Sequence, residues 1–113
     1  MPKQVIFYED DNGREPFTEW LDNLRDIVGR QHILARLTRL AQGNYGDYKP
    51  VGEGVNELRM FLGPGYRVYF GEDGKDIVIL LCGGDKGSQQ DDIRKAKAYW
   101  KEYNEREKLS NSR

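Results

Sequence analysis

The chain of 113 residues carries 18 basic and 19 acidic side chains but only one histidine and one cysteine. Its length predicts a single domain over residues 1–113, and the lone Cys82 excludes an internal disulfide framework and indicates a reducing cytosol. With so few nitrogen and sulfur ligands we expect no zinc site. The apolar run 77–82 is too short to cross a bilayer and the N-terminal residues resemble no secretion signal, so we expect a cytoplasmic protein without membrane contact.

Two elements are predicted within residues 3–24. Residues 3–9 are rich in β-forming side chains and end at the turn sequence 10–13, which predicts a strand. Pro16 suits the first turn of a helix. The apolar residues behind it recur at helical spacing and predict an amphipathic helix: Phe17, Trp20, Leu21 and Leu24.

A second helix is predicted to follow directly and to end at Gly43 and Asn44. Its inward stripe consists of Ile33, Leu37, Leu40 and Ala41. Arg36 and Arg39 lie off this stripe, so both are expected to face water. The two successive helices predict a helical hairpin, and residues 44–54 are predicted to be a loop.

The sequence of residues 57–69, ELRMFLGPGYRVY, predicts a β-hairpin with a three-residue loop at 63–65. One face is apolar in this register and pairs Leu58 with Phe70, Met60 with Val68, and Leu62 with Tyr66. The other face carries Glu57, Arg59, Phe61, Arg67 and Tyr69. Arg59 is expected opposite Tyr69, and both arginines share one side of the sheet with two aromatic rings.

The last third of the chain predicts one strand and one helix. Residues 76–82 are almost continuously apolar, which indicates an interior strand covered on both faces. After a glycine-rich loop, Ser88 resembles the cap of a final helix. The inward stripe of this helix consists of Ile93, Ala96, Trp100 and Tyr103. The tail from about residue 104 is expected to fray.

The predicted order is therefore β-α-α-β-β-β-α. This is an α+β domain in which two N-terminal helices and a C-terminal helix pack on a small, twisted, antiparallel-rich sheet.

Three cations come together in this prediction: Arg59 and Arg67 on the hairpin, and Lys86 at the end of the interior strand. Guanidinium groups bind phosphate oxygens bidentately and stabilise charge that develops during transfer. Phe61 and Tyr69 can stack on unpaired bases. When the 2′-hydroxyl of RNA is the nucleophile, cleavage needs positioning, charge stabilisation and proton carriers. The pattern is therefore compatible with a phosphodiester site.

A solvated sheet surface, with Glu57 paired to Arg59, explains the same pattern. The net charge is only −1, although residues 29–71 hold six basic and three acidic side chains. An ordinary charged surface also produces such an uneven distribution of basic and acidic residues along the chain. The proton carrier stays open, because Glu57, Tyr66 and Tyr69 are all candidates and His32 lies in the second helix.

Four stretches of the chain resemble the small toxins of bacterial toxin–antitoxin pairs: PFTEWLDNLRD, GNYGDYKPVGEGVNELR, GPGYRVYF and LLCGGDKGSQQDDIRKAKAYW. Their order is similar to that of the RelE/ParE superfamily, in its phage-derived, HigB-like branch of addiction module killer proteins. The resemblance covers about residues 5–103 and implies the RelE-like fold, with the element order given above.

The resemblance also implies an mRNA interferase, an endoribonuclease that cleaves message at the ribosome and inhibits translation without a metal or other cofactor. Arg67 matches the arginine with which the family contacts the scissile phosphate. Lys86 lies in the loop where relatives place another basic catalytic residue, and Arg59 lies on a strand that supplies basic residues. Tyr69 completes the predicted catalytic set as a hypothetical proton carrier. The predicted RNA-binding residues are Phe61, Tyr66, Arg36 and Arg39.

The implied partners are the ribosome, mRNA and a cognate helix-turn-helix antitoxin, through which alone the toxin would reach operator DNA. Two other functions remain open. One is poisoning of DNA gyrase, as by ParE-like members, and the other is non-catalytic binding by a protein of phage origin.

Overall fold

The computed structural model describes residues 2–111, which form one mixed five-stranded sheet with three helices. The strands are β1 (Gln4–Phe7), β2 (Tyr48–Gly52), β3 (Val55–Arg59), β4 (Arg67–Asp73) and β5 (Ile77–Gly84). The helices are α1 (Pro16–Asp22), α2 (Ile27–Ala41) and α3 (Gln89–Asn111), with the short 3-10 turn η1 (Lys86–Ser88) before α3. The strand order is β1-β5-β4-β3-β2; β1 runs parallel to β5 and the other neighbours are antiparallel. The predicted α+β class is confirmed.

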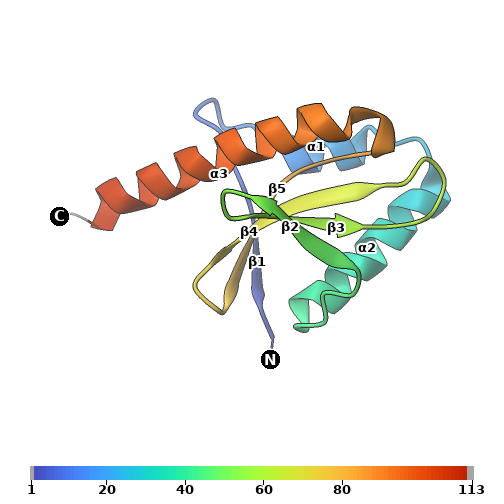
Figure 1. Ribbon diagram of the computed structural model, residues 1–113, viewed down its shortest axis with the longest axis horizontal. Helices are drawn as coiled ribbons and strands as arrows, with labels where there is room; N and C mark the ends of the chain where they lie inside the picture. The colour runs from blue at the N-terminus through green and yellow to red at the C-terminus, as the bar shows by residue number, and fades with distance from the viewer. Residues whose placement is uncertain (1, 112–113) are drawn as a thin grey trace.

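Helices cover both faces of the sheet: α1 and α2 pack on one side and α3 on the other (Figure 1). Glycines in the interior strands let the helices approach closely. A Cβ atom at Gly83 would lie 2.3 Å from the Trp20 ring of α1, and one at Gly71 would lie 2.4 Å from the Trp100 ring of α3. As predicted, β5 is an interior strand, between β1 and β4. No helix within residues 2–111 combines the length and apolarity needed to cross a membrane.

The predicted loop at 44–54 is wrong in its middle, because residues 48–52 form the edge strand β2. An edge strand needs ladder hydrogen bonds on one side only, so it tolerates Pro50. Because this stretch contains many turn-forming residues, its sequence predicted a loop instead of a strand.

The predicted hairpin register is wrong by two residues. Arg59 pairs with Arg67, and Glu57 rather than Arg59 pairs with Tyr69. A shift of two leaves every side chain on its predicted face, since side chains alternate with a period of two. Met60 therefore opposes Tyr66, where the Met60 N–H donates to the Tyr66 carbonyl at 3.0 Å, and the connecting loop is longer than three residues.

The final helix α3 includes the segment from about residue 104 that was expected to fray, and it continues through Asn111. Its far part extends past the sheet (Figure 1). Arg106 anchors this part: its guanidinium donates to the Glu9 carbonyl at 2.9 Å and to Asp11 at 3.2 Å, and it pairs with Glu102. Residues 112 and 113 of the predicted tail lie outside the described residues.

Arg36 was expected to face water, and the structure corrects this: the residue is only 9% exposed. Its guanidinium donates to the carbonyl oxygens of Arg59 at 2.7 Å, Tyr45 at 3.1 Å and Asp47 at 3.2 Å. Burial lowers the pKa of Arg36. The side chain therefore ties α2 to the end of β3 and to the segment that enters β2, where it provides a donor for three backbone carbonyl oxygens.

We expect Arg36→Ala to lower the free energy of unfolding by about 2–4 kcal/mol, because it removes three hydrogen bonds that join α2 to the ends of β3 and β2. Arg39→Ala is the matched control: the residue lies on the same helix, is exposed, and should change stability by less than about 0.5 kcal/mol. Urea unfolding of the two variants measures the difference. Equal effects would show that the Arg36 contacts do not support the fold.

Candidate functional site

The structure places Arg59, Arg67 and Lys86 at one end of the sheet. Arg59 ends β3, Arg67 begins β4 as its register partner, and Lys86 follows the end of β5. The Lys86 N–H donates to the Pro64 carbonyl at 3.3 Å, which joins the β3–β4 loop to the loop after β5. The three cations predicted from the sequence are thus brought to neighbouring positions.

Arg67 is held in a buried polar network centred on Glu57, whose side chain is 0% exposed. Arg67 Nε lies 3.6 Å from Glu57 Oε2, and Arg67 also donates to the Gly65 carbonyl at 2.8 Å. Glu57 Oε2 accepts the Tyr69 hydroxyl at 3.1 Å and the Gln89 amide at 2.8 Å. Two buried atoms of the pair, Glu57 Oε1 and Arg67 Nε, have no hydrogen-bond partner among the described residues. The network fixes Arg67 but leaves it only 9% exposed.

Arg59 is held between a carboxylate and an aromatic ring. It forms an ion pair with Asp47 at 3.1 Å, and its guanidinium carbon lies 5.7 Å from the centroid of the Phe61 ring. Phe61 is 82% exposed, which is unusual for a large apolar side chain. An exposed ring beside a cation is suited to stacking on an unpaired base.

Lys86 is the exposed cation of the group. Within residues 2–111 it forms no ion pair, whereas Arg59 and Arg67 each have a carboxylate partner. Its ammonium group is therefore the one most available to an anion from solution.

The two tyrosines considered as proton carriers are both buried. Tyr69 is 0% exposed, and burial followed by the Glu57 charge raises its pKa. Tyr66 is 4% exposed and faces α1 and α2, where its ring contacts Trp20 edge-on. Burial and a hydrogen bond to Asp26 raise the pKa of Tyr66 to about 12. The structure thus places the Tyr66 ring against α1 and α2, on the other face of the sheet from the arginines, and gives Tyr69 no exposed surface.

Of the remaining predicted RNA-binding residues, one is buried and two are exposed. Arg36 is buried against backbone carbonyls and does not reach the surface. Arg39 is exposed on α2, as predicted. Phe61 and Arg39 therefore remain as exposed RNA-binding candidates.

Sequence reasoning missed the contribution of α3 to this end of the sheet. Gln89 reaches Glu57, and the neighbouring Asp92 is 8% exposed and accepts the Ser88 hydroxyl. Burial raises the pKa of Asp92. The cap predicted at Ser88 lies three residues too late, because Asp85 is the N-cap of η1 and Ser88 closes the capping box with it. Polar residues at the start of a helix are typical of caps. Only the fold shows that Gln89 and Asp92 point toward the sheet instead.

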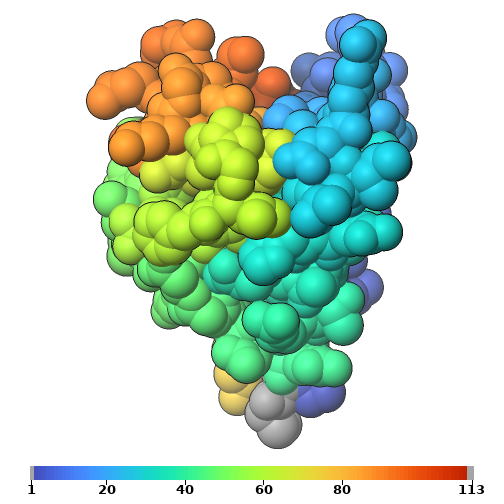
Figure 2. Space-filling model, turned by 90° about the vertical axis from the view of Figure 1, so that its right-hand side faces the viewer, coloured from blue at the N-terminus to red at the C-terminus, as the bar shows by residue number. Residues whose placement is uncertain are grey.

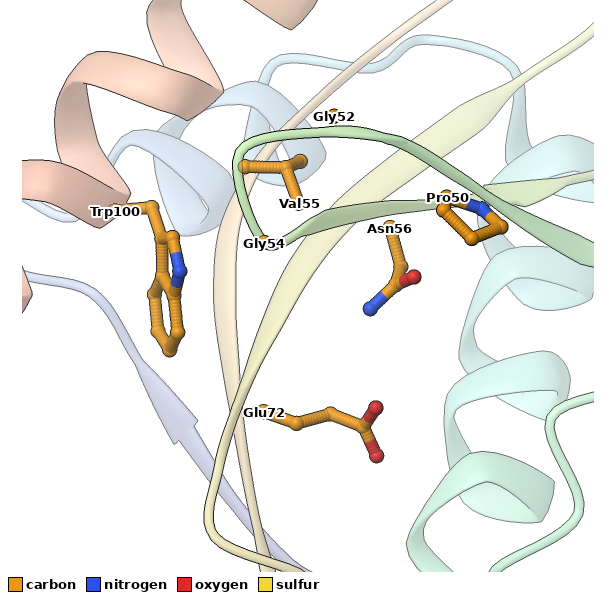
Figure 3. A pocket seen from close by; sticks show the side chains of 7 residues that line it. All are labelled: Pro50, Gly52, Gly54, Val55, Asn56, Glu72 and Trp100. Carbon is orange, nitrogen blue, oxygen red and sulfur yellow. The ribbon is translucent and has the colours of Figure 1, made fainter.

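A separate hollow of about 430 Å³ lies at the opposite end of the sheet, where β3 begins and β4 ends (Figure 3). Its lining consists of Pro50, Gly52, Gly54, Val55, Asn56, Glu72 and Trp100. None of the predicted site residues contributes to it. In the part of the chain that the structure describes, no group of three or more His, Cys, Asp or Glu side chains is arranged to hold a metal ion.

The chain is 48% identical, over 81 residues, to an uncharacterized protein of Haemophilus influenzae. The aligned part makes up 72% of this chain and 82% of the relative. No protein-family model matches the chain.

We expect Glu57→Leu to lower the free energy of unfolding by about 3–5 kcal/mol, because it leaves the Arg67 charge buried without its partner. The double variant Glu57→Leu/Arg67→Leu should recover a large part of this loss, since both charges are then replaced by apolar groups. Urea unfolding of wild type, single and double variants measures the coupling. Additive losses would contradict the pairing.

Asp26 provides a pH-dependent link between α2 and the β3–β4 loop. It accepts the Gly29 N–H at 2.9 Å and the Tyr66 hydroxyl at 2.7 Å, and these bonds lower its pKa. A lowered carboxyl pKa contributes stability above the unfolded value of about 3.9, and this is lost as the pH falls through the folded value. The difference in unfolding free energy between wild type and Asp26→Asn should therefore be largest above about pH 5 and shrink in acid. A difference that does not vary with pH would rule out the charged form as the source.

Proposed function

We propose that this chain, which belongs to the same protein family as the uncharacterized protein of Haemophilus influenzae, is the toxin of a bacterial toxin–antitoxin module of the RelE/ParE type. It acts in the cytoplasm as an mRNA interferase: it cleaves mRNA at the ribosome without a metal or cofactor and so inhibits translation. Its proposed partners are the ribosome, mRNA and a helix-turn-helix antitoxin, which alone connects it to operator DNA.

The observation that supports this proposal most is the pairing of Arg59 with Arg67 beside Lys86. Arg67 is fixed by a buried carboxylate, so its guanidinium needs no reordering before it meets a phosphate. In a partly desolvated position, a cation attracts an anion more strongly than it does in water. This arrangement is suited to stabilising the charge that develops on a phosphodiester.

The other exposed groups have separate roles in the proposal. Lys86 approaches the phosphate from the loop after β5, and Phe61 stacks on an unpaired base beside it. Arg59 holds the ring in place through its contact at 5.7 Å. Arg39 on α2 contacts the RNA backbone farther away.

The burial of Tyr69 and Glu57 favours a second candidate function, because it takes two possible proton carriers away from the surface. A protein that binds its target without cleaving RNA needs no such group. A gyrase poison of the ParE-like kind, or a non-catalytic binding protein of phage origin, is therefore the alternative.

Expression of the wild-type chain in bacteria should arrest growth and produce new RNA 5′ ends within translated codons. Lys86→Ala and Arg67→Lys should each lower cleavage by about 10²-fold or more, because the first removes a cation and the second keeps the charge but loses the two-pronged guanidinium. Mapping of RNA 5′ ends during arrest measures this.

Arg94→Ala is the matched control, since this exposed arginine lies on α3 and pairs with Asp91. It should leave cleavage unchanged. Growth arrest without cleavage of mRNA would indicate that the protein acts on gyrase or another target. Equal cleavage by all variants would exclude the cation group as the site.

A further inference from the structure

The outward face of α2 differs from an ordinary solvent-exposed helix surface. Six exposed positions of α2 recur at helical spacing along one face, which the exposed His32 and Arg39 border: Ile27, Val28, Gln31, Leu34, Ala35 and Thr38. None of the six is charged. Ile27 and Val28 are each 65% exposed and Leu34 is 46% exposed. A surface helix normally carries charged and polar residues on this face.

Another helix of the same chain shows the ordinary pattern. The exposed positions of α3 include Asp91, Arg94, Lys101 and Glu105. The aliphatic groups on α2 are therefore a local departure, and clustered apolar side chains in contact with water raise the free energy unless something covers them.

Basic side chains border the apolar face of α2. The exposed His32 and Arg39 lie along one edge, and residues 27–41 include no carboxylate. Arg30 lies along the other edge, where it is half-buried and its guanidinium also donates to the Leu24 carbonyl at 3.0 Å. The nearby Asp26 is occupied by the Gly29 N–H and the Tyr66 hydroxyl. A complementary surface must therefore offer apolar groups flanked by negative charge.

The apolar residues of this face are not part of the proposed RNA site, although Arg39 at its edge is shared by the two proposals. The β3–β4 loop (yellow-green) lies beside the first turns of α2 (light blue to teal) in Figure 2, in agreement with the Tyr66–Asp26 contact. The apolar face thus begins next to the cations and continues away from them. Its groups are aliphatic, and unlike Phe61 they offer no ring for stacking on bases, which favours a protein over RNA. A second copy would bring the same cations together across α2, which is unfavourable.

We propose that the outward face of α2 docks an amphipathic, acidic segment of a different protein. Its apolar side chains cover Ile27, Val28 and Leu34, and its carboxylates meet Arg30 and Arg39, in the manner of a helix laid on an apolar surface. The inference rests on the proposed function in one respect: the antitoxin encoded beside the chain is the probe to use.

The test compares two variants that each add two carboxylates to an exposed helix. Val28→Glu/Leu34→Glu alters the apolar face of α2, and Gln90→Glu/Ala98→Glu alters exposed positions of α3. Calorimetric titration with the purified antitoxin should show a loss of affinity of about 100-fold or more for the first variant and little change for the second. Wild-type affinity should also fall as salt increases. Both variants should still arrest growth when expressed without antitoxin.

Each other result would overturn the proposal. Equal binding of the antitoxin by both variants, or no binding to wild type, would place the partner elsewhere. A wild-type dimer in solution that Val28→Glu/Leu34→Glu converts to monomer would assign the face to a second copy. Loss of arrest by this variant in folded form would assign the face to the ribosome or RNA. If wild type does not arrest growth, the proposed function alone fails; the docking surface then stands only if the protein encoded beside the chain binds wild type and loses affinity for Val28→Glu/Leu34→Glu.

Discussion

The end of the sheet that carries the candidate site depends on one buried carboxylate. Glu57 has no exposed surface, and it connects β4 through Arg67 and Tyr69 with α3 through Gln89. An ionised group inside a protein is tolerated only when opposite charge and hydrogen bonds replace water. The position of Arg67, the orientation of Tyr69 and the start of α3 are therefore set together. A change at Glu57 therefore affects both the position of Arg67 and the contact of α3 with the sheet.

Burial of the Glu57 network has two effects: it holds Arg67 in place, and it keeps two possible proton carriers away from the surface. The network orders Arg67 but removes Glu57 and Tyr69 from contact with a substrate, while Lys86 and Phe61 remain exposed. In the proposed nuclease, this surface therefore contributes charge and orientation, and in many phosphoryl transfers these two effects lower the barrier more than proton transfer does. A cleavage reaction here takes its proton carriers from exposed groups or from the bound target. The need for a proton carrier is the physical difference between the proposed nuclease and a protein that only binds its target.

The sequence predicted most elements because their apolar periodicities are strong, including the interior strand β5 and the stripes of all three helices. It did not predict β2, because residues 48–52 form an edge strand that needs few β-forming residues. The faces of the hairpin were predicted correctly, but pairing rules alone left the register two residues off. The inward turn of Arg36 and Gln89 could not be predicted, since it depends on backbone carbonyls and a carboxylate that other elements supply. The local sequence pattern thus predicted which elements carry the cations. Contacts between distant parts of the chain determine which of these cations are exposed.

The helix α2 shows how far an amphipathic pattern can be altered by its surroundings. On its inner side Arg36 lies among apolar residues because three carbonyl oxygens accept its hydrogen bonds. On its outer side Ile27, Val28 and Leu34 are exposed. The inward arginine is explained by contacts within the chain. The outward aliphatic groups have no such explanation in the fold, because they neither fill the core nor cap the helix. Their arrangement between basic edges is understood only if a partner completes the surface, and that partner must be apolar where α2 is apolar and acidic where α2 is basic.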